Sequence, residues 1–472
     1  MIVADTIWQP DLSPNGKTRA KYDRLAQAIR DGITDGQLAT GAQLPPVRDL
    51  AYRVGVTPGT VARAYRILID EKRLVAGVGR GTFVAEPSPD PKNRLSPFVA
   101  DPVPDDQAGA HLLSPNMPDY GQGALIRDGL RYLADHAPAT TLMRYPSRHS
   151  DLAARQAYLA TLDPEIVGEV GIEDIVLSHG GQNAIVMILQ TILQGTSPVI
   201  LVDELSYNGF RSAADLARAE VFSVPWDDDG PDPAALASLA RNQKAQVFCT
   251  TAEVSNPTTH CTTPARRAQI AQVAQQLGLH VIDDDCYNRT HRIGPSYRAL
   301  IPDLGWHVTS PSKSLTPALR IGFAIGPRSF TAALVRSATG NSFGVSQMIS
   351  DLYAYLMAQP TLPGILTQVT DRITRDVSAA ADILQGHEVN WAEGTPFIWL
   401  TLPPPWRAGA FAEAAKAQGI LLKTAEVFAQ RDSRMVHAVR IAVNGGLAHD
   451  RFVEALHLLR GLLDNPPPRI SV

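Results

Sequence analysis

Residues 245–287, AQVFCTTAEVSNPTTHCTTPARRAQIAQVAQQLGLHVIDDDCY, hold the pattern that decides the fold. Apolar runs at 245–253 and 279–287 lie on either side of an amphipathic segment at 264–278. Short apolar runs bounded by turn residues are typical of buried strands, and a strand–helix–strand order is typical of parallel strands joined by a covering helix. This stretch therefore predicts an α/β fold built on a mostly parallel sheet.

The same alternation continues on both sides of this stretch. Four more short apolar runs lie at 174–181, 197–204, 307–313 and 322–327. Ligands bind outside the carboxyl ends of strands in such sheets. The residues at those predicted ends are Gly180, Asp203, Glu253, Asp284 and Lys313. From about residue 355 to 472, helices mix with short strands, which predicts a smaller α+β subdomain at the end of one large domain that spans 111–472.

The charge of the chain is distributed unevenly. Its 472 residues include 43 basic and 47 acidic side chains, for a net charge of −4. Residues 15–85 hold twelve Lys or Arg and six Asp or Glu, a balance of +6, so the remainder carries −10. A basic segment joined to an acidic body is typical of a nucleic-acid-binding module fused to another domain, although a chance imbalance of surface charge gives the same numbers.

Residues 86–110 predict a linker between these two parts. The stretch EPSPDPKNRLSPFVADPVPDD at 86–106 contains six prolines in 21 residues. Proline lacks a backbone donor and disfavours helix in the residue before it, so we expect an extended, semi-stiff connection. A meandering surface loop within one domain is the alternative.

Composition excludes several classes of protein. Apolar residues make up 44% and charged residues 19% of the chain, which excludes wholesale disorder. We expect no membrane span, because no run of about 18 apolar residues occurs, and no secretory signal at the N-terminus. Three cysteines in so long a chain suit the reducing cytoplasm and argue against a disulfide framework or a zinc site. Residues 283–285 lack the spacing of a calcium loop, so we expect no metal.

Residues 20–84, within a module that we bound at 15–85, predict three helices followed by a hairpin. Helical spacing extends over 22–34, over 47–54 and from Pro58 onward, and a glycine-rich hairpin tip follows. Thr57 is a suitable N-cap for the third helix, because Pro58 occupies the first helical position. Two short helices joined by a tight turn form a helix-turn-helix, and the hairpin behind them forms a wing.

The start of the third helix and the wing are the surfaces that we expect at DNA. Such a helix places small polar residues beside phosphates and base edges, and arginine suits a phosphate, a guanine edge or the narrow minor groove. The expected DNA contacts are Arg48, Thr57, Gly59, Thr60, Arg63, Arg80 and Gly81. Any one exposed arginine taken alone is more simply a solvated side chain. Together, LPPVRDLA at 44–51, GVT at 55–57 and GRGTFV at 79–84 resemble the GntR-family winged helix, which implies operator DNA as a partner.

The segment HVTSPSKSLTPALRIG at 307–322 combines a lysine with hydroxyls and an arginine. A lysine that forms a Schiff base needs a neighbouring cation to lower its pKa, and phosphate binding needs hydroxyls and an arginine fork. Ser310, Ser312, Lys313 and Arg320 supply both within eleven residues. A solvated loop lysine is the simpler alternative.

Further polar groups follow the other predicted strands. Asp284 ends a buried strand, where a carboxylate is costly unless it pairs with a cation such as a protonated pyridine nitrogen. Tyr287 and Asn256 can each donate a hydrogen bond to a phenolate oxygen on the same ring. The amides of Gly181 and Gln182 begin a predicted helix and could hold a phosphate. Tyr207 could stack on a ring or could be an ordinary core or surface tyrosine.

In this order the motifs resemble those of fold-type I pyridoxal-phosphate aminotransferases over roughly 112–460. The resemblance implies pyridoxal 5′-phosphate as cofactor, with Lys313 as the Schiff-base lysine. It implies ring or phosphate contacts for Gly181, Gln182, Tyr207, Asn256, Asp284, Tyr287, Ser310, Ser312 and Arg320. It also implies that Arg440 clamps a substrate carboxylate and that Tyr145 reaches the phosphate of the neighbouring subunit. The sequence departs from the family at SRHSDLAAR after Tyr145 and at Thr259, where glycine is common.

The whole chain resembles the MocR subfamily of bacterial transcription regulators, in which a GntR-type winged helix is fused to an aminotransferase-like domain. The resemblance implies a cytoplasmic homodimer, often head to tail, whose cofactor and an amino-acid or other amine effector, held as an aldimine, tune operator binding. A working aminotransferase with an accessory winged helix is the alternative. The cofactor residues cannot separate the two, because a sensor and an enzyme bind the ring alike.

Overall fold

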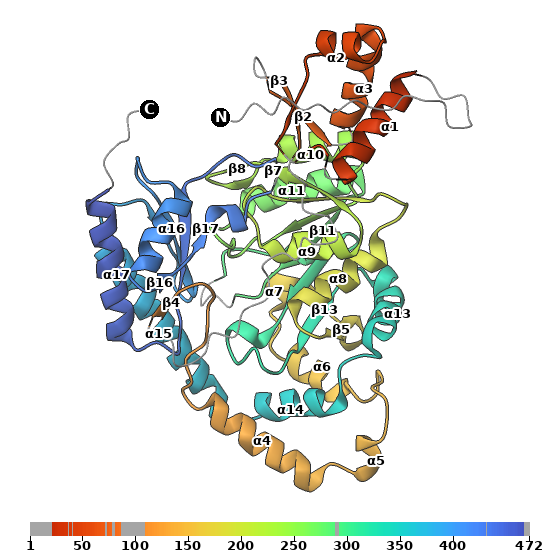
Figure 1. Cartoon of the computed structure of the whole chain (residues 1–472). Coiled ribbons are helices and arrows are strands. Elements are labelled where there is room, and N and C mark those ends of the chain that lie inside the picture. Colours follow the sequence, from red (N-terminus) through yellow and green to blue (C-terminus); the bar gives the residue numbers. More distant parts are fainter. Residues whose placement is uncertain are drawn as a thin grey trace. The chain divides into compact units, whose positions relative to one another are not determined.

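The computed structural model describes residues 21–35, 37–39, 41–70, 73–77, 81–85, 109–287, 292–430 and 432–466 (Figure 1). The chain divides into two compact units, Met1–Ala100 and Asp101–Val472. The predicted proline-rich linker at 86–110 lies outside the described residues except for its last two positions. Each unit is described by itself.

The first unit is built from three helices and a small antiparallel sheet. The helices are α1 (Lys21–Thr34), α2 (Val47–Arg53) and α3 (Pro58–Asp70), and the sheet has the order β1 (Gln43–Leu44), β3 (Gly81–Val84), β2 (Leu74–Gly77). Leu25, Val61 and Leu68 are fully buried at the helix contacts. The strand β1 was not predicted, because two residues between turn signals are too few to show an alternating pattern.

The large part of the second unit contains a seven-stranded sheet. Its order is β5 (Ile175–Ser178), β13 (Gly322–Ile325), β12 (Gly305–Thr309), β11 (His280–Asp284), β10 (Val247–Thr250), β6 (Val199–Asp203) and β7 (Glu220–Val224). Strand β13 is antiparallel to both of its neighbours, and all other adjacent pairs are parallel. Five of the strands lie within predicted apolar runs, and a sixth, β12, begins two residues before its run at 307–313. The edge strand β7 was missed because only its last residue is buried, so its sequence carries little apolar signal.

Helices cover both faces of this sheet. On one face α8 (Gly181–Ile192), α9 (Asn208–Leu216) and α13 (Thr331–Ser342) pack against the strands, and on the other α10 (Pro233–Gln243), α11 (Pro264–Leu277) and α12 (Tyr297–Leu300) do so. Local sequence sets the ends of α11: the Thr263 hydroxyl accepts from the Arg266 amide at 3.3 Å, and Gly278 ends the helix at a φ of +64°. The remaining elements of this part are α4 (Gln122–His136), α5 (Ala139–Leu142), α6 (Leu152–Leu159), α7 (Pro164–Val167), α14 (Gln347–Met357), β8 (Trp226–Asp227) and β9 (Gly230–Pro231).

The small C-terminal part has its own sheet and core. Its strands β14 (Val389–Asn390), β15 (Phe397–Thr401), β18 (Ala438–Ala442) and β17 (Lys423–Thr424) are antiparallel and packed by α15 (Leu362–Ile383), α16 (Ala408–Ala417) and α17 (His449–Asp464) (Figure 1). An additional strand β4 (Ala110–His111) pairs in parallel with β16 (Ile420–Leu421). The beginning of the second unit therefore completes a subdomain that the sequence suggested only from residue 355 onward.

Two absences hold for the described residues. None of their helices is long and apolar enough to cross a membrane. They also contain no group of three or more His, Cys, Asp or Glu side chains arranged to hold a metal ion.

Candidate functional site

The carboxyl ends of the central strands bring the predicted pocket residues to one edge of the sheet. Strand β5 leads through Gly180 into α8, β11 ends at Asp284, and β12 leads into a turn at Pro311–Lys313. Because β11 and β12 are adjacent and parallel, the residues that follow them lie side by side. The chain thus gathers a lysine, a carboxylate and a helix N-terminus at one place.

Asp284 is a buried carboxylate with one oxygen that accepts no hydrogen bond from the described residues. Burial raises the pKa of this carboxyl from 3.8 to about 7, and Asp283 and Asp285 add to that effect. A hydrogen bond with the Cys286 thiol and the charge of Lys313 lower the pKa of Asp284 in part. Its Oδ1 has no hydrogen-bond partner among the described residues. A buried carboxylate oxygen without a donor is a site that a cationic N–H group would satisfy.

The charges of Asp284, Arg320 and Arg440 all act on the amine of Lys313. Burial lowers the pKa of its amine to about 8, with further lowering by Arg440 and Arg320 and a smaller opposing effect of Asp284. At neutral pH a lysine with such a pKa spends a useful fraction of time as the free amine, which is the nucleophilic form. Burial is thus the largest cause of the lowered pKa of Lys313, and the two arginines add to it.

An anion cradle is formed where α8 begins. Gly180 has a φ of +87°, and a Cβ there would lie 2.7 Å from Nη2 of Arg320. A Cβ on Gly181 would lie 2.9 Å from Sγ of Cys286. The positive φ of Gly180 favours glycine there, and a side chain at position 181 would require Cys286 to shift. The first amides of α8 lack intrahelical acceptors and carry the partial positive charge of the helix dipole, so this end suits a phosphate.

Two serines and Arg320 complete the polar groups near this cradle. Ser310 caps the turn that carries Lys313, since its hydroxyl accepts from the Ser312 amide at 3.2 Å and lies 2.6 Å from the Ser312 hydroxyl. Arg320 donates to the carbonyl of His179 at 3.1 Å and has a φ of +48°. The side chain of Arg320 is thereby held against the loop that precedes α8.

Gln182 and Tyr207 meet at the start of α9. The Gln182 side chain donates to the carbonyl of Gly209 at 2.9 Å. A Cβ on Gly209 would collide with both Gln182 and the ring of Tyr207, so a larger residue there would displace the ring. Burial raises the pKa of Tyr207, which therefore stays a neutral phenol.

Asn256, Tyr287 and Arg440 form one hydrogen-bonded chain. Arg440 donates from Nη1 to Asn256 Oδ1 at 2.6 Å, and Asn256 donates from Nδ2 to the Tyr287 hydroxyl at 3.1 Å. Because the arginine fixes which end of the amide accepts, the donor end of Asn256 faces Tyr287. Arg440 also donates to the carbonyl of Leu113 at 2.8 Å.

The turn that carries Asn256 keeps the shape that glycine would favour. Thr259 has a φ of +64°, in the left-handed region, and its amide donates to the carbonyl of Ser255 at 2.8 Å. The departure from the family pattern at this position leaves the turn in place and adds local backbone strain instead.

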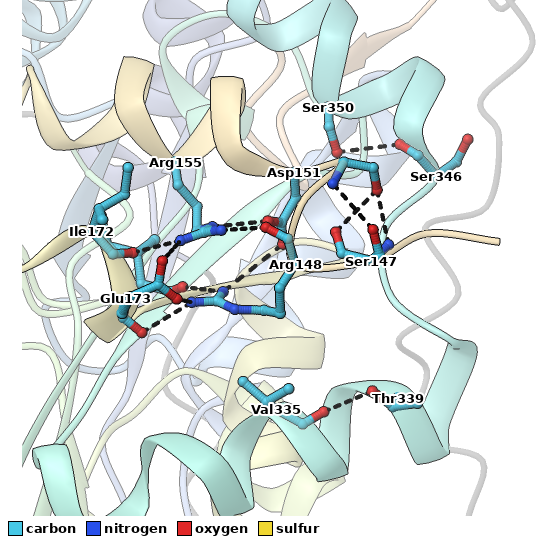
Figure 2. Close-up of polar contacts among 12 residues, drawn as sticks. Ser147, Arg148, Asp151, Arg155, Ile172, Glu173, Val335, Thr339, Ser346 and Ser350 are labelled. Carbon is cyan, nitrogen blue, oxygen red and sulfur yellow. Dashed lines mark hydrogen bonds and ion pairs between the residues drawn. The ribbon is translucent and has the colours of Figure 1, made fainter. Parts of the chain in front are cut away.

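Tyr145 does not lie with the residues around Lys313. Its side chain is 78% exposed and packs against Phe343 at 5.1 Å between ring centroids. The unusual segment after it is anchored to the region before β5, as Figure 2 shows. Arg148 donates to the carbonyl of Ile175 at 2.7 Å and to the Glu173 carboxylate at 2.9 Å, and Arg155 pairs with Asp151 at 2.8 Å (Figure 2).

Several residues of this pocket were not found from the sequence. The Cys286 thiol forms a hydrogen bond with Asp284. The rings of Phe397 and Phe428 lie 5.2 and 4.8 Å from the Arg440 guanidinium. Lys423 on β17 is directly opposite Arg440 on the neighbouring strand β18. These contacts depend on strand register and packing, so no local sequence motif predicts them.

In the first unit, the described DNA-contact candidates lie on α2, α3 and the wing. Arg48 and Gly59 are exposed, and the Thr57 hydroxyl caps α3 by accepting from the Thr60 amide at 3.3 Å. The Thr57 and Thr60 hydroxyls also lie 2.9 Å apart. Arg63 packs its guanidinium 4.0 Å from the ring of Tyr22 on α1.

The hairpin supplies the remaining candidates. Gly81 has a φ of +110°, a conformation that residues with a side chain rarely adopt, so the wing favours glycine at this position. Arg80 lies outside the described residues.

Comparison with known proteins matches both units to described families. Residues 111–456 match the family "Aminotransferase class I and II", and residues 21–84 match "Bacterial regulatory proteins, gntR family". The chain is 29% identical over 448 residues to the vitamin B6 salvage pathway transcriptional repressor PtsJ of Salmonella typhimurium, covering 91% of this chain and 95% of that protein. It is 28% identical over 458 residues to the HTH-type transcriptional regulator TauR of Rhodobacter capsulatus, covering 88% and 91%.

Solved structures resemble the second unit in fold. An archaeal alanine:glyoxylate aminotransferase superposes with a TM-score of 0.67 at 18% identity, covering 75% of this chain and 91% of its own. At that identity the likeness shows the fold alone.

Proposed function

Because the chain belongs to the class I and II aminotransferase family and joins that fold to a GntR-type winged helix, we propose that it is a transcription regulator that binds operator DNA and responds to pyridoxal phosphate and an amino-acid effector. The observation that carries this proposal is the fusion itself, together with relatives such as PtsJ and TauR that match over nearly their whole length and are transcriptional regulators. The architecture is that of the MocR subfamily.

The DNA-binding half rests on the first unit. The GntR helix-turn-helix binds DNA. The start of α3 would offer Thr57, Gly59 and Thr60 to the major groove, and α2 would offer the exposed Arg48. Phosphate contacts of arginine would supply affinity, while base contacts at the helix start would supply sequence preference. Gly81 shapes the described part of the wing, and in the sequence it directly follows Arg80, the remaining candidate for a DNA contact.

The second unit fits pyridoxal phosphate by the chemistry of its donors. Lys313 offers a partly deprotonated amine, Asp284 offers a buried oxygen in need of a donor, and α8 begins with a glycine cradle beside Arg320. Gln182, Tyr207, Asn256, Tyr287, Ser310 and Ser312 lie at the edges of this pocket and complete the proposed set. When bound, the coenzyme supplies an aldehyde that captures amines and a ring that withdraws electrons.

Each residue has a physical role in this proposal. Asp284 would keep a ring nitrogen protonated, since only a cationic partner offsets the desolvation cost of a buried carboxylate. Lys313 would anchor the coenzyme through its amine and yield that place when an amine effector arrives. Arg440, held by Asn256 and Leu113, presents its remaining donors to a carboxylate.

Regulation requires that the effector favour one arrangement of the protein over another. A ligand shifts a conformational equilibrium only through its different affinity for the two states, and typical couplings amount to roughly 1–3 kcal/mol. We propose that exchange at Lys313 alters closure of the small C-terminal part and that the segment at 86–110 carries this change to the DNA-binding unit. We further propose a cytoplasmic homodimer, head to tail, with Tyr145 directed to the partner subunit.

The test uses the full-length protein saturated with pyridoxal phosphate and DNA selected by the protein from a random pool. We expect visible coenzyme absorption and retained DNA in a gel shift. Lys313→Ala should abolish the absorption, whereas Lys416→Ala, an exposed lysine paired with Glu413, should leave it unchanged. Repeated turnover of amino acids without retention of any selected DNA would overturn the regulator and favour the aminotransferase.

A further inference from the structure

A cavity of about 230 Å³ lies beside the turn that carries Lys313, between α6, β13, α14 and the start of α15. Its wall includes Ser310 and Pro311, which precede Lys313 in the chain, and Ser314 and Leu315, which follow it. Lys313 itself is not among the described residues that line this space. The turn therefore borders a second space besides the pocket that we assign to the coenzyme.

The wall of this cavity is largely apolar and aromatic. The ring of Tyr158 stacks on that of Phe323 at 4.0 Å between centroids, and Phe323 lies 5.1 Å from the ring of Tyr353. None of the described residues that line the cavity has a charged side chain. A charged ligand would lose its hydration there without gaining an ionic partner, so the wall suits a neutral molecule. Aromatic rings in such a wall can pack edge to face on a further ring.

One polar group of this wall lacks a partner. Tyr158 is only 5% exposed, and its hydroxyl has no hydrogen-bond partner among the described residues. Burial raises the pKa of this hydroxyl, so it stays a neutral donor. The hydroxyls of Thr161 and Thr309 in the same wall already donate to the backbone carbonyls of Tyr158 and Asp285, at 2.7 and 2.8 Å. A buried hydroxyl without a partner is costly, and an acceptor atom on a ligand would remove that cost.

The volume of the cavity limits the size of its ligand. An apolar cavity of about 150 Å³ is enough to hold benzene, whereas pockets for drug-sized ligands begin at about 300 Å³. At about 230 Å³ the cavity has space for one aromatic ring with a short substituent. Voids larger than a water molecule are few in a packed interior, so this one is unusual. Thr161 in its wall is exposed, which gives a ligand access from solvent.

We infer that this cavity is a binding site for a small neutral aromatic molecule with one hydrogen-bond acceptor, such as an aromatic ketone. The Tyr158 hydroxyl donates to the acceptor, and the rings of Phe323 and Tyr353 contact the aromatic part of the ligand. The inference goes beyond the proposed function, because this site needs neither coenzyme nor DNA. It places a second ligand against the turn that presents Lys313.

The test uses three probes that have equal numbers of non-hydrogen atoms and differ in one group. Acetophenone has a ketone, α-methylstyrene has a carbon in place of the ketone oxygen, and benzoate has a charged carboxylate. Each is titrated into the full-length protein by calorimetry, and the melting temperature is followed in parallel. We expect saturable binding and a raised melting temperature with acetophenone and α-methylstyrene, and neither effect with benzoate.

Two pairs of variants locate the binding. Tyr158→Phe should lower the ratio of acetophenone affinity to α-methylstyrene affinity by about three- to tenfold, the contribution of one neutral hydrogen bond. Tyr132→Phe changes a tyrosine that is 46% exposed and does not line the cavity, so it should leave this ratio unchanged. Leu366→Trp enlarges a side chain of the wall and should abolish binding of both probes. Leu458→Trp makes the same change at a leucine of α17 that is 42% exposed, and should preserve binding.

Four results would overturn the inference. These are no saturable binding of acetophenone or α-methylstyrene, benzoate binding as tight as that of acetophenone, binding that survives Leu366→Trp, and an unchanged affinity ratio in Tyr158→Phe. If Leu366→Trp does not fold, Tyr158→Phe decides the question, because it removes a single oxygen atom.

Pyridoxal phosphate separates this inference from the proposed function. We expect acetophenone to bind with and without saturating coenzyme, and also in Lys313→Ala, which has no amine at this position for the ketone. Displacement of acetophenone by the coenzyme would place it in the coenzyme pocket and overturn the inference. Acetophenone binding with the expected variant pattern, in a chain that never acquires coenzyme absorption, would support the cavity and contradict the proposed function. Coenzyme absorption and retained DNA without binding of either neutral probe would do the reverse.

Discussion

At the scale of single residues, Asp284, the residue that we propose for the ring nitrogen, costs the coenzyme-free protein stability. The pKa of its carboxyl is raised from 3.8 to about 7 by burial, so the folded coenzyme-free chain holds a proton there more tightly than the unfolded chain does. The resulting penalty is absent below about pH 3.8, grows between pH 3.8 and 7, and is complete above pH 7. A neutral side chain of the same shape escapes this penalty.

We therefore predict opposite effects of Asp284→Asn on stability and on binding. Coenzyme-free Asp284→Asn should melt higher than the unmodified protein at pH 8, by about 2 °C for each kcal/mol regained, and the gain should vanish near pH 4. Its affinity for pyridoxal phosphate should fall by about tenfold or more, since a hydrogen bond to a charged group contributes roughly 1.5–3 kcal/mol. Calorimetric melting at the two pH values and a coenzyme titration measure both effects.

The outcome that contradicts this assignment is specific. If Asp284→Asn lowered the melting temperature at pH 8 and left coenzyme affinity unchanged, the carboxylate would be part of the core and not of the site. Asp303→Asn serves as the matched control, because Asp303 is an exposed aspartate and its substitution should change neither quantity by more than a small amount.

Sequence reasoning placed those pocket residues that lie close to a strand end. Lys313 and Asp284 stand in short local patterns, because a parallel strand delivers whatever follows it to the same edge of the sheet. Contacts between distant segments could not be placed in this way. Arg440 donates to the carbonyl of Leu113, 327 positions earlier in the chain, and Lys423 meets Arg440 only through the register of two strands.

At the scale of elements, the short strand β4 joins the first described residues of the second unit to its last subdomain. The amide of Ala110 donates to the carbonyl of Gly419 at 2.8 Å, and that of Leu112 donates to the carbonyl of Leu421 at 2.9 Å. Leu112 is fully buried in the core of the small part. The adjacent Leu113 carbonyl fixes Arg440, so this element links the packing of the subdomain to the pocket.

We predict that Leu112→Ala destabilises the second unit by about 2–5 kcal/mol, because it leaves a cavity in a packed core. Leu458→Ala removes the same number of atoms from a leucine of α17 that is 42% exposed, and should cost no more than about 0.5 kcal/mol. Denaturant unfolding followed by the tryptophans of this unit measures both. Equal small effects of the two variants would mean that β4 is not needed to complete this core.

We also predict that Leu112→Ala weakens ligand binding at the proposed site. If β4 positions Arg440 through Leu113, coenzyme-loaded Leu112→Ala should bind amino acids more weakly while keeping its coenzyme absorption under conditions in which it remains folded. Unchanged amino-acid affinity in the folded variant would restrict the role of β4 to stability.

At the scale of the whole molecule, the charges of the two units differ in sign. Residues 15–85 carry +6 and the remainder −10, so the net positive charge that attracts DNA lies in the N-terminal part. Binding that depends on phosphate contacts weakens as salt rises, and each neutralised phosphate contributes about −0.9 to the slope of log affinity against log salt concentration. The acidic remainder adds repulsion that disfavours contacts of the second unit with the duplex.

We predict that Arg48→Ala reduces the magnitude of this slope by about 1 and weakens binding of selected DNA, because one phosphate contact is lost. If Arg48 instead reads a guanine edge, affinity should fall by roughly 1–3 kcal/mol with little change in slope and with relaxed preference at one base pair. Arg451→Ala removes an exposed arginine of α17 that pairs with Glu454, so its slope should match that of the unmodified protein. Fluorescence anisotropy at several salt concentrations distinguishes these results. An unchanged affinity and an unchanged slope in Arg48→Ala would remove α2 from the DNA contact, since an exposed arginine that touches neither phosphate nor base contributes to neither quantity.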